Sequence, residues 1–266
     1  MVHRSEVLHG SHFQTYYQWA PPSQDLAPFV EHYWRLDSYR SLPMGVAEHF
    51  VPGLASRLVF PFDNGCYYQL PGQIPRLIQG PHLVPPQARP LACLHPASKG
   101  VLGLSLTPSG LAAFGGARGT REIQLLPEWQ TGQAVLANCG SFEQQCHVLN
   151  QQLPGWFFPS SSSETLRSAL AELEKGHAVA ETAAHIGLSA RSLQRLFLQT
   201  LGHSPRTCQR VLRLRRTLQG NWQNPAQAIW DSDYCDYSHF FKEFKALMGQ
   251  SPSGYLRQFS LTHTQA

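Results

Sequence analysis

The sequence has no long apolar run. No stretch approaches the roughly 18 apolar residues that a membrane-spanning helix requires. The first residues, MVHRSEVLHGSHF, contain no apolar core of the kind found in a secretory signal peptide. We therefore expect a cytoplasmic chain with no membrane partner.

Cysteine pairs with metal-ligand spacing are also absent. The six cysteines form no C-x-x-C pair, so their spacing indicates neither a zinc site nor a disulfide framework, and we expect reduced thiols. The eight histidines of residues 1–158, among them His49, His82 and His95, are irregularly spaced. Surface or hydrogen-bonded histidines are a simpler interpretation than a metal site, and we expect no cofactor.

The motifs of common enzyme classes are missing as well. The chain contains no G-x-S-x-G elbow, no Walker loop and no G-x-G-x-x-G fingerprint, and Glu48, His49 and Asp63 indicate no acid–base pair. We therefore expect no enzymatic activity. Two alternatives stay open: a metal-binding barrel enzyme fused to a helical module that binds DNA or protein, and a module that recruits protein and not DNA.

Excess positive charge is confined to one part of the chain. Residues 1–162 carry nine basic and nine acidic side chains, whereas residues 163–266 carry twelve basic and eight acidic ones. The whole net charge of +4 therefore lies in the C-terminal part. This is a weak indication of a polyanionic partner, and an ordinary solvated surface would have the same composition.

The two halves of the chain predict different folds, and together an α+β protein. Three apolar segments bounded by turn signals, at residues 30–36, 55–62 and 101–107, have the length and pattern of strands. With helices at residues 109–114 and 142–153, they predict a mainly β barrel or sandwich with trailing helices over residues 1–158. The serine-rich residues 159–163 have the composition of a short flexible linker. Beyond them the pattern predicts an all-helical domain over residues 159–266.

Residues 178–201 predict a helix-turn-helix. The small Ala183 allows a second helix to approach closely, Gly187 suits the left-handed end of the first helix, and Ser189 suits the N-cap of the second. The second helix has one apolar face, and the opposite polar face would either read bases in a major groove or simply be solvated. The outward residues are Arg191, Gln194 and Arg195.

A second unit of the same form covers residues 225–248. The two units end alike, in Leu201-Gly202-His203-Ser204-Pro205 and in Met248-Gly249-Gln250-Ser251-Pro252, with the glycines 47 residues apart. A linking helix is predicted between them at residues 205–219. We expect most of its five arginines to be solvated or paired with acidic side chains, and we assign Arg210 to a DNA phosphate contact. The second unit's candidate DNA-binding residues are Tyr237, Ser238, His239, Lys242 and Lys245.

This repeated arrangement resembles the AraC/XylS family of bacterial transcriptional regulators over about residues 165–259. In the first unit the resemblance rests on Ala183, Gly187, Leu188, Ser189, Leu193, Gln194, Arg195, Phe197, Gly202 and Pro205. In the second it rests on Tyr234, Ser238, His239, Phe240, Phe244, Gly249, Ser251 and Pro252. The resemblance implies a seven-helix domain whose two recognition helices enter major grooves on one face of a duplex.

The resemblance also implies roles and partners. It places Arg191, Gln194 and Arg195 at the base-reading positions of the first motif. It places Tyr237, Ser238 and Lys242 at those of the second. The implied partners are promoter DNA, a second copy of the chain in a homodimer, RNA polymerase and a small-molecule effector bound by the N-terminal half. A bacterial protein of this kind would be nucleoid-associated when bound to DNA.

The second unit departs from the family pattern. Where the family has Ala and, four residues later, Gly-Phe, this chain has Ile229, Asp233 and Tyr234. The bulky isoleucine hinders close helix packing, and aspartate tolerates a left-handed backbone less readily than glycine. We therefore expect the first motif to carry more of the base reading and the second more of the backbone anchoring.

Overall fold

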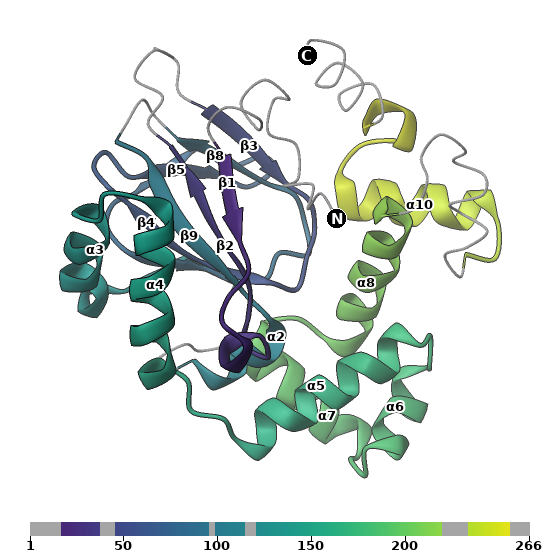
Figure 1. The fold of residues 1–266 in the computed structure, drawn as a ribbon. Helices are drawn as coiled ribbons and strands as arrows, with labels where there is room; N and C mark the ends of the chain where they lie inside the picture. The colour runs from purple at the N-terminus through teal and green to yellow at the C-terminus, as the bar shows by residue number, and fades with distance from the viewer. Residues whose placement is uncertain (1–16, 38–45, 96–98, 115–120, 220–233, 256–266) are drawn as a thin grey trace.

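The computed structural model describes residues 17–37, 46–95, 99–114, 121–219 and 234–255. Its N-terminal half contains two antiparallel β-sheets with helices alongside, and its C-terminal half is helical (Figure 1). The predicted α+β fold class and sandwich-like N-terminal half are confirmed. Residues 220–233, which include Ile229, Asp233 and the predicted first helix of the second unit, lie outside the described ranges.

The larger sheet has six strands in the order β1-β2-β9-β4-β7-β10. These strands are β1 Tyr17–Ala20, β2 Val30–Leu36, β9 Val101–Leu106, β4 Ser56–Pro61, β7 His82–Val84 and β10 Gln124–Leu125. The three segments predicted as strands form β2, β4 and β9 at the centre of this sheet. Every residue of β9 is buried, as in a strand that is covered on both faces.

The smaller sheet has four strands in the order β3-β8-β5-β6. They are β3 Val46–Phe50, β8 Leu91–His95, β5 Cys66–Gln69 and β6 Arg76–Ile78. Buried residues alternate with more exposed ones along β5 and β8, so one face of this sheet is turned to the core. An apolar cluster that includes Trp34, Val59 and Leu91 fills the space between the sheets.

Helices and aromatic rings cover the other face of the larger sheet. The elements are α2 Pro108–Ala113, α3 Gln130–Ala137 and α4 Phe142–Gln152, with short 3-10 turns at Gln24–Leu26, Pro127–Trp129 and Leu153–Trp156. Figure 1 places α3 and α4 beside this sheet. The rings of Trp129 and Trp156 lie 4.4 Å apart between centroids, and the Tyr33 hydroxyl on β2 donates to Asn150 Oδ1 on α4 at 2.7 Å.

The C-terminal half begins directly at the serine run. Its helices are α5 Ser161–Glu174, α6 Val179–His185, α7 Ala190–Leu201, α8 Pro205–Gln219 and α10 Tyr237–Met248. Ser160 is the N-cap of α5, and its backbone N–H and side chain form a reciprocal pair of hydrogen bonds with Ser163. The flexible linker predicted at residues 159–163 is therefore wrong, because these serines start a helix.

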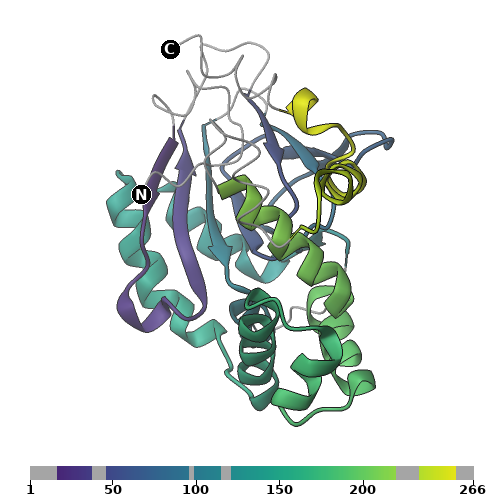
Figure 2. The ribbon, with the colours of Figure 1, turned by 90° about the vertical axis from the view of Figure 1, so that its right-hand side faces the viewer.

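The two halves pack directly against each other. Helix α2 lies against α5 and α7, and one apolar cluster extends from Leu104 and Leu111 to Leu166 and Phe197. Figure 2 shows the helical half running along one side of the sheets. No helix among the described residues is long and apolar enough to cross a membrane.

Polar contacts fix the end of α7 to the N-terminal half. Arg121 Nε donates to the carbonyl of Gly202, the C-cap of α7, at 2.7 Å. The adjacent His203 donates from Nε2 to the carbonyl of Pro86 at 3.0 Å, and burial lowers the pKa of this histidine, which keeps it neutral. The position of α7 therefore depends on both halves of the chain.

Candidate nucleic-acid interface

Helices α6 and α7 form the predicted first helix-turn-helix. Gly187 follows α6 with a φ of +70°, a left-handed conformation that glycine adopts without strain. Ser189 caps α7 by accepting a hydrogen bond from the backbone N–H of Ser192 at 3.1 Å. The turn chemistry that the sequence indicated is confirmed.

The two faces of α7 differ sharply. Leu193, Phe197 and Leu201 are fully buried, whereas the side chains of Arg191, Gln194 and Arg195 are exposed. Within the described part of the chain, none of these three outward side chains forms a hydrogen bond or an ion pair, so all three can meet an external partner. Leu198 is also 37% exposed on this helix.

Helix α10 begins with a side-chain cap and ends at a left-handed glycine, as α7 does. Asp236 caps it by accepting from the backbone N–H of His239 at 2.7 Å, and Gly249 ends it with a φ of +71°. Asp236 lies 47 residues after Ser189, and Gly249 lies 47 residues after Gly202. Each position of α10 is therefore equivalent to the position of α7 that lies 47 residues earlier.

The equivalence shows how the two outward faces differ. Ser238, Lys242 and Lys245 take the positions of Arg191, Arg195 and Leu198, and all three are exposed. The half-buried Phe241 takes the position of Gln194. Tyr237 is 60% exposed at the start of the helix, whereas the half-buried His239 packs edge-on against Tyr234 at 5.4 Å. α10 therefore offers shorter or less directional donors than α7.

Arg210 on α8 meets an acidic side chain of α10. Its Nε donates to Glu243 Oε2 at 3.1 Å, while Arg213 Nη1 lies 3.7 Å from Glu243 Oε1. The hydroxyl of Tyr234, whose pKa is raised by burial, donates to the same carboxylate at 3.2 Å. The phosphate contact assigned to Arg210 stays a prediction, and the structure gives this arginine a part in holding α10 on α8.

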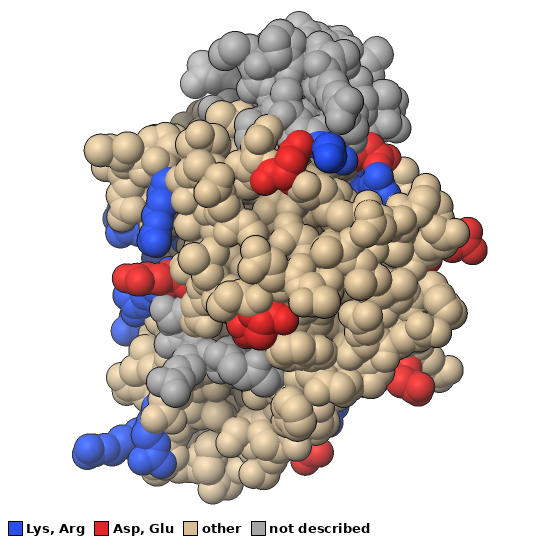
Figure 3. All heavy atoms as spheres, turned by 90° about the vertical axis from the view of Figure 1, so that its left-hand side faces the viewer, with Lys and Arg blue, Asp and Glu red and all other residues tan. Residues whose placement is uncertain are grey.

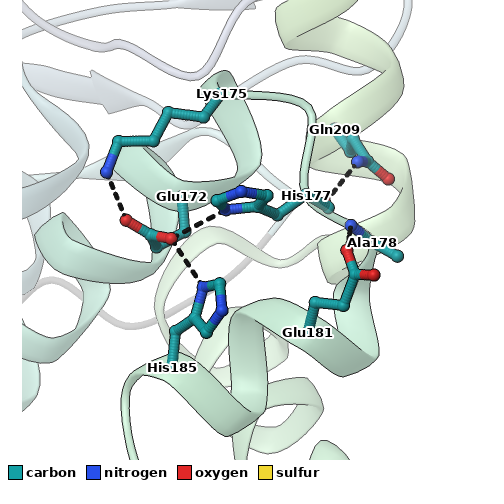
Figure 4. A network of polar contacts seen from close by, with 7 residues as sticks. All are labelled: Glu172, Lys175, His177, Ala178, Glu181, His185 and Gln209. Atoms are coloured by element: carbon teal, nitrogen blue, oxygen red, sulfur yellow. Dashed lines mark hydrogen bonds and ion pairs between the residues drawn. The ribbon is translucent and has the colours of Figure 1, made fainter.

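A second polar network fixes the turn between α5 and α6 (Figure 4). Glu172 accepts from Lys175 Nζ at 2.5 Å and from the Nδ1 atoms of His177 and His185 at 2.8 and 2.9 Å. Together, led by the Lys175 hydrogen bond, these donors lower the pKa of Glu172 to about 2. Gln209 on α8 donates to the carbonyl of His177 at 2.8 Å. This network links the α5–α6 turn to α5, α6 and α8.

The face on the α3 and α4 side carries little positive charge. In Figure 3 the described Lys and Arg side chains on this face gather near its edges, and isolated acidic residues lie between uncharged ones. A polyanion binds where basic side chains converge. This face therefore does not compete with the outward faces of α7 and α10 as a surface for nucleic acid.

The sequence predicted the exposed faces of α7 and α10 but not the contacts that position these helices. Glu243 and Glu172 were not singled out, because an acidic residue on an amphipathic helix looks like an ordinary solvated side chain. The role of Glu243 becomes evident only when α8 and α10 are packed together, because Glu243 then lies opposite Arg210 and Arg213.

Comparison with known proteins agrees with the two-unit arrangement. Residues 166–258 match the family model described as a helix-turn-helix domain, and this range contains α7 and α10. No curated protein matches the chain.

Several solved structures are similar at low identity. ToxT from Vibrio cholerae is 11% identical, with 92% of this chain and 99% of that chain covered and a TM-score of 0.47. An unsaturated fatty acid-bound ToxT from Vibrio cholerae strain SCE256 is 10% identical, with coverages of 91% and 95% and a TM-score of 0.45. The AraC-like transcriptional activator CuxR is 10% identical, with coverages of 83% and 92% and a TM-score of 0.25.

Proposed function

We propose that this chain, whose C-terminal region is a helix-turn-helix domain of the AraC type, is a transcriptional regulator that binds specific sequences of double-stranded DNA. The observation that carries the proposal is the pair of recognition helices α7 and α10. They have equivalent caps 47 residues apart and opposite faces of buried apolar and exposed polar side chains.

The proposed mechanism assigns sequence reading mainly to α7. Arg191 and Arg195 present planar guanidinium groups that suit guanine O6 and N7, and Gln194 presents an amide that suits adenine N6 and N7. All three lie in the first half of the helix, which is the part that enters a major groove in helix-turn-helix proteins. Basic side chains around them contact phosphates, which supply affinity and register but no sequence information.

We assign α10 mainly to anchoring on the DNA backbone. Lys242 and Lys245 carry point charges that bind phosphate without bidentate geometry. Ser238 has the shortest side chain of these three exposed residues. The two helices are expected to enter successive major grooves, about 34 Å apart along the duplex.

Replacing Arg195 by alanine is expected to cost about 1–3 kcal/mol on a specific site and to reduce discrimination against other sequences. The matched change, Lys242→Ala, is expected to weaken specific and random duplexes by similar factors, because it removes a phosphate contact. Sites are selected from a random duplex library, and each variant is then titrated against selected and random DNA at one salt concentration. Equal losses for Arg195→Ala on both duplexes would contradict base reading.

We further propose that the N-terminal half regulates DNA binding through a small-molecule effector. A cavity of about 530 Å³ between the sheets and helices α5 and α8 supports this, because its size is typical of small-molecule sites. The charged residues lining it are Glu31, Glu48, Arg57, Arg167, Glu174 and Arg215. An occupant would touch both halves, and α5, which lines the cavity at Leu170 and Ala171 and packs against α7, offers a route to the recognition helix.

We also propose that the chain forms a homodimer through the outer face of the four-stranded sheet. Leu94, Tyr67 and Leu77 lie side by side across β8, β5 and β6, and each is 36–39% exposed. A row of apolar side chains on an open sheet face is a typical protein–protein contact.

The full-length chain is expected to sediment at twice the chain mass at micromolar concentration, and Leu77→Glu is expected to shift it towards the monomer. Leu125→Glu, at a more exposed position on the other sheet (56% against 38% for Leu77), is the control and should leave the mass unchanged. Analytical ultracentrifugation of the full chain makes the measurement. A wild-type monomer at micromolar concentration would rule the dimer out.

A further inference from the structure

A cluster of metal-ligating side chains lies between the two sheets, away from α7 and α10. Tyr68 pairs with Cys93 and Tyr67 with Leu94 in the register of β5 and β8, so Cys66 lies opposite His95. Because side chains alternate along a strand, Cys66, Cys93 and His95 share the face turned to the core. Their exposed fractions are 0%, 1% and 1%.

The distances in this cluster match the coordination sphere of zinc. Cys66 Sγ lies 3.4 Å and Cys93 Sγ 4.0 Å from His95 Nδ1, and the three ligand atoms all lie within 4.8 Å of one another. A tetrahedral zinc has Zn–S bonds of about 2.3 Å and Zn–N bonds of about 2.0–2.1 Å, which sets sulfur and nitrogen about 3.6 Å apart. A single ion can therefore bridge all three side chains with small adjustments.

Glu48 orients the histidine as a metal ligand requires. Its Oε2 lies 2.6 Å from His95 Nε2, and the carboxylate is 4% exposed. A carboxylate only accepts, so Nε2 carries the proton, and in the neutral ring the lone pair of Nδ1 faces the two sulfur atoms. Zinc-bound histidines characteristically donate a hydrogen bond from the other ring N–H to a carboxylate in this way.

We propose that Cys66, Cys93 and His95 bind a zinc ion, with Glu48 as the positioning residue for His95. Three protein ligands leave one coordination position open, as in zinc sites that hold an exchangeable ligand. Glu48 also lines the cavity between the two halves of the chain, so that cavity extends to the residue that contacts His95. The ion would join β5 and β8 of the four-stranded sheet, and Glu48 would connect the site to β3.

The chain offers a second grouping of possible ligands, and it serves as a control. Glu172, His177 and His185 lie close together at the α5–α6 turn, but Glu172 is already bound by the Lys175 ammonium group. A cation there would have to displace that lysine from an accessible network (Figure 4). The buried thiols are therefore the site that we assign to zinc.

The first test is the zinc content of the full chain, produced without a histidine tag in zinc-supplemented medium and kept reduced. We expect one zinc per chain by atomic emission, lost in Cys66→Ser and in Cys93→Ser. Cys208→Ser, which changes an equally buried cysteine on α8, and His185→Gln, which changes the exposed network, should both keep the zinc. Retention in both cluster variants, loss in His185→Gln, or copper in place of zinc would overturn the proposal.

A second measurement uses the unaltered chain, in case a cluster variant does not fold. Cobalt(II) added to metal-free protein should give sulfur-to-cobalt charge-transfer absorption and the visible bands of a tetrahedral ion, and added zinc should abolish both. Glu48→Gln should still bind one zinc, but about 10–100-fold more weakly in a chelator competition. Cobalt spectra without a thiolate band, or a Glu48→Gln affinity equal to the wild type, would contradict the site as described.

Discussion

Replacing Glu243 by alanine is expected to destabilise the C-terminal domain by about 3 kcal/mol and to release α10 from α8. The carboxylate accepts from Arg210 and Tyr234 and lies 3.7 Å from Arg213, and its own residue is only 9% exposed. Removing one partner of a largely buried ion pair typically costs about 3–5 kcal/mol, because the remaining charges lose their compensation. The partial exposure of both arginines places the expected loss at the low end of that range.

The loss is measured by urea unfolding and by hydrogen exchange of the α10 amides. Hydrogen exchange should accelerate more in α10 than in α7, because the Glu243 ion pair holds α10, and not α7, on α8. Glu243→Gln is the matched control: its amide oxygen still accepts from Tyr234 but carries no charge for the arginines, so its loss should be smaller. A Glu243→Ala variant that unfolds within about 0.5 kcal/mol of the wild type would mean that the ion pair contributes nothing measurable.

The same contact accounts for one departure of the second motif from the family pattern. Tyr234 stands where the family has phenylalanine, and its hydroxyl reaches Glu243. The ring stays in the apolar core, edge-on to Phe240 at 5.2 Å between centroids. The tyrosine therefore keeps the packing of a phenylalanine and adds a hydrogen bond between the segment that precedes α10 and the middle of that helix.

Features set by neighbours along the chain were predictable from the sequence. The left-handed Gly187, the cap Ser189 and the apolar face of α7 each depend on residues within one or two turns of helix, so local patterns identified them. The central strands β2, β4 and β9 were predicted for the same reason. The serine run at residues 159–163 was misread because linkers and helix N-caps favour the same residue type.

Contacts between distant segments could not be predicted in this way. Cys66 and His95 meet because β5 and β8 pair in one particular register, and Glu48 joins them from a third strand. A shift of one residue in that register would turn the side chains to the other face of the sheet. No spacing rule along the chain encodes such a site, which is why the cysteine pattern gave no indication of it.

Replacing Phe197 by alanine is expected to lower the free energy of unfolding by about 3–5 kcal/mol, the usual loss for a buried phenylalanine. Phe197 is 0% exposed on α7 and belongs to the apolar cluster that runs from the helical half into the N-terminal half. The cavity would therefore weaken both the helix-turn-helix and its attachment to the sheets, and DNA affinity should fall although no outward residue has changed.

Urea unfolding compares this variant with Leu198→Ala, the adjacent side chain on the same helix, which is 37% exposed. The control should shift stability by no more than about 0.5 kcal/mol, as surface changes usually do. Because the core is shared, Phe197→Ala should lower the midpoint of a single transition. Two separate transitions, with only the helical half destabilised, would show that the halves unfold independently and that α7 is not coupled to the sheets.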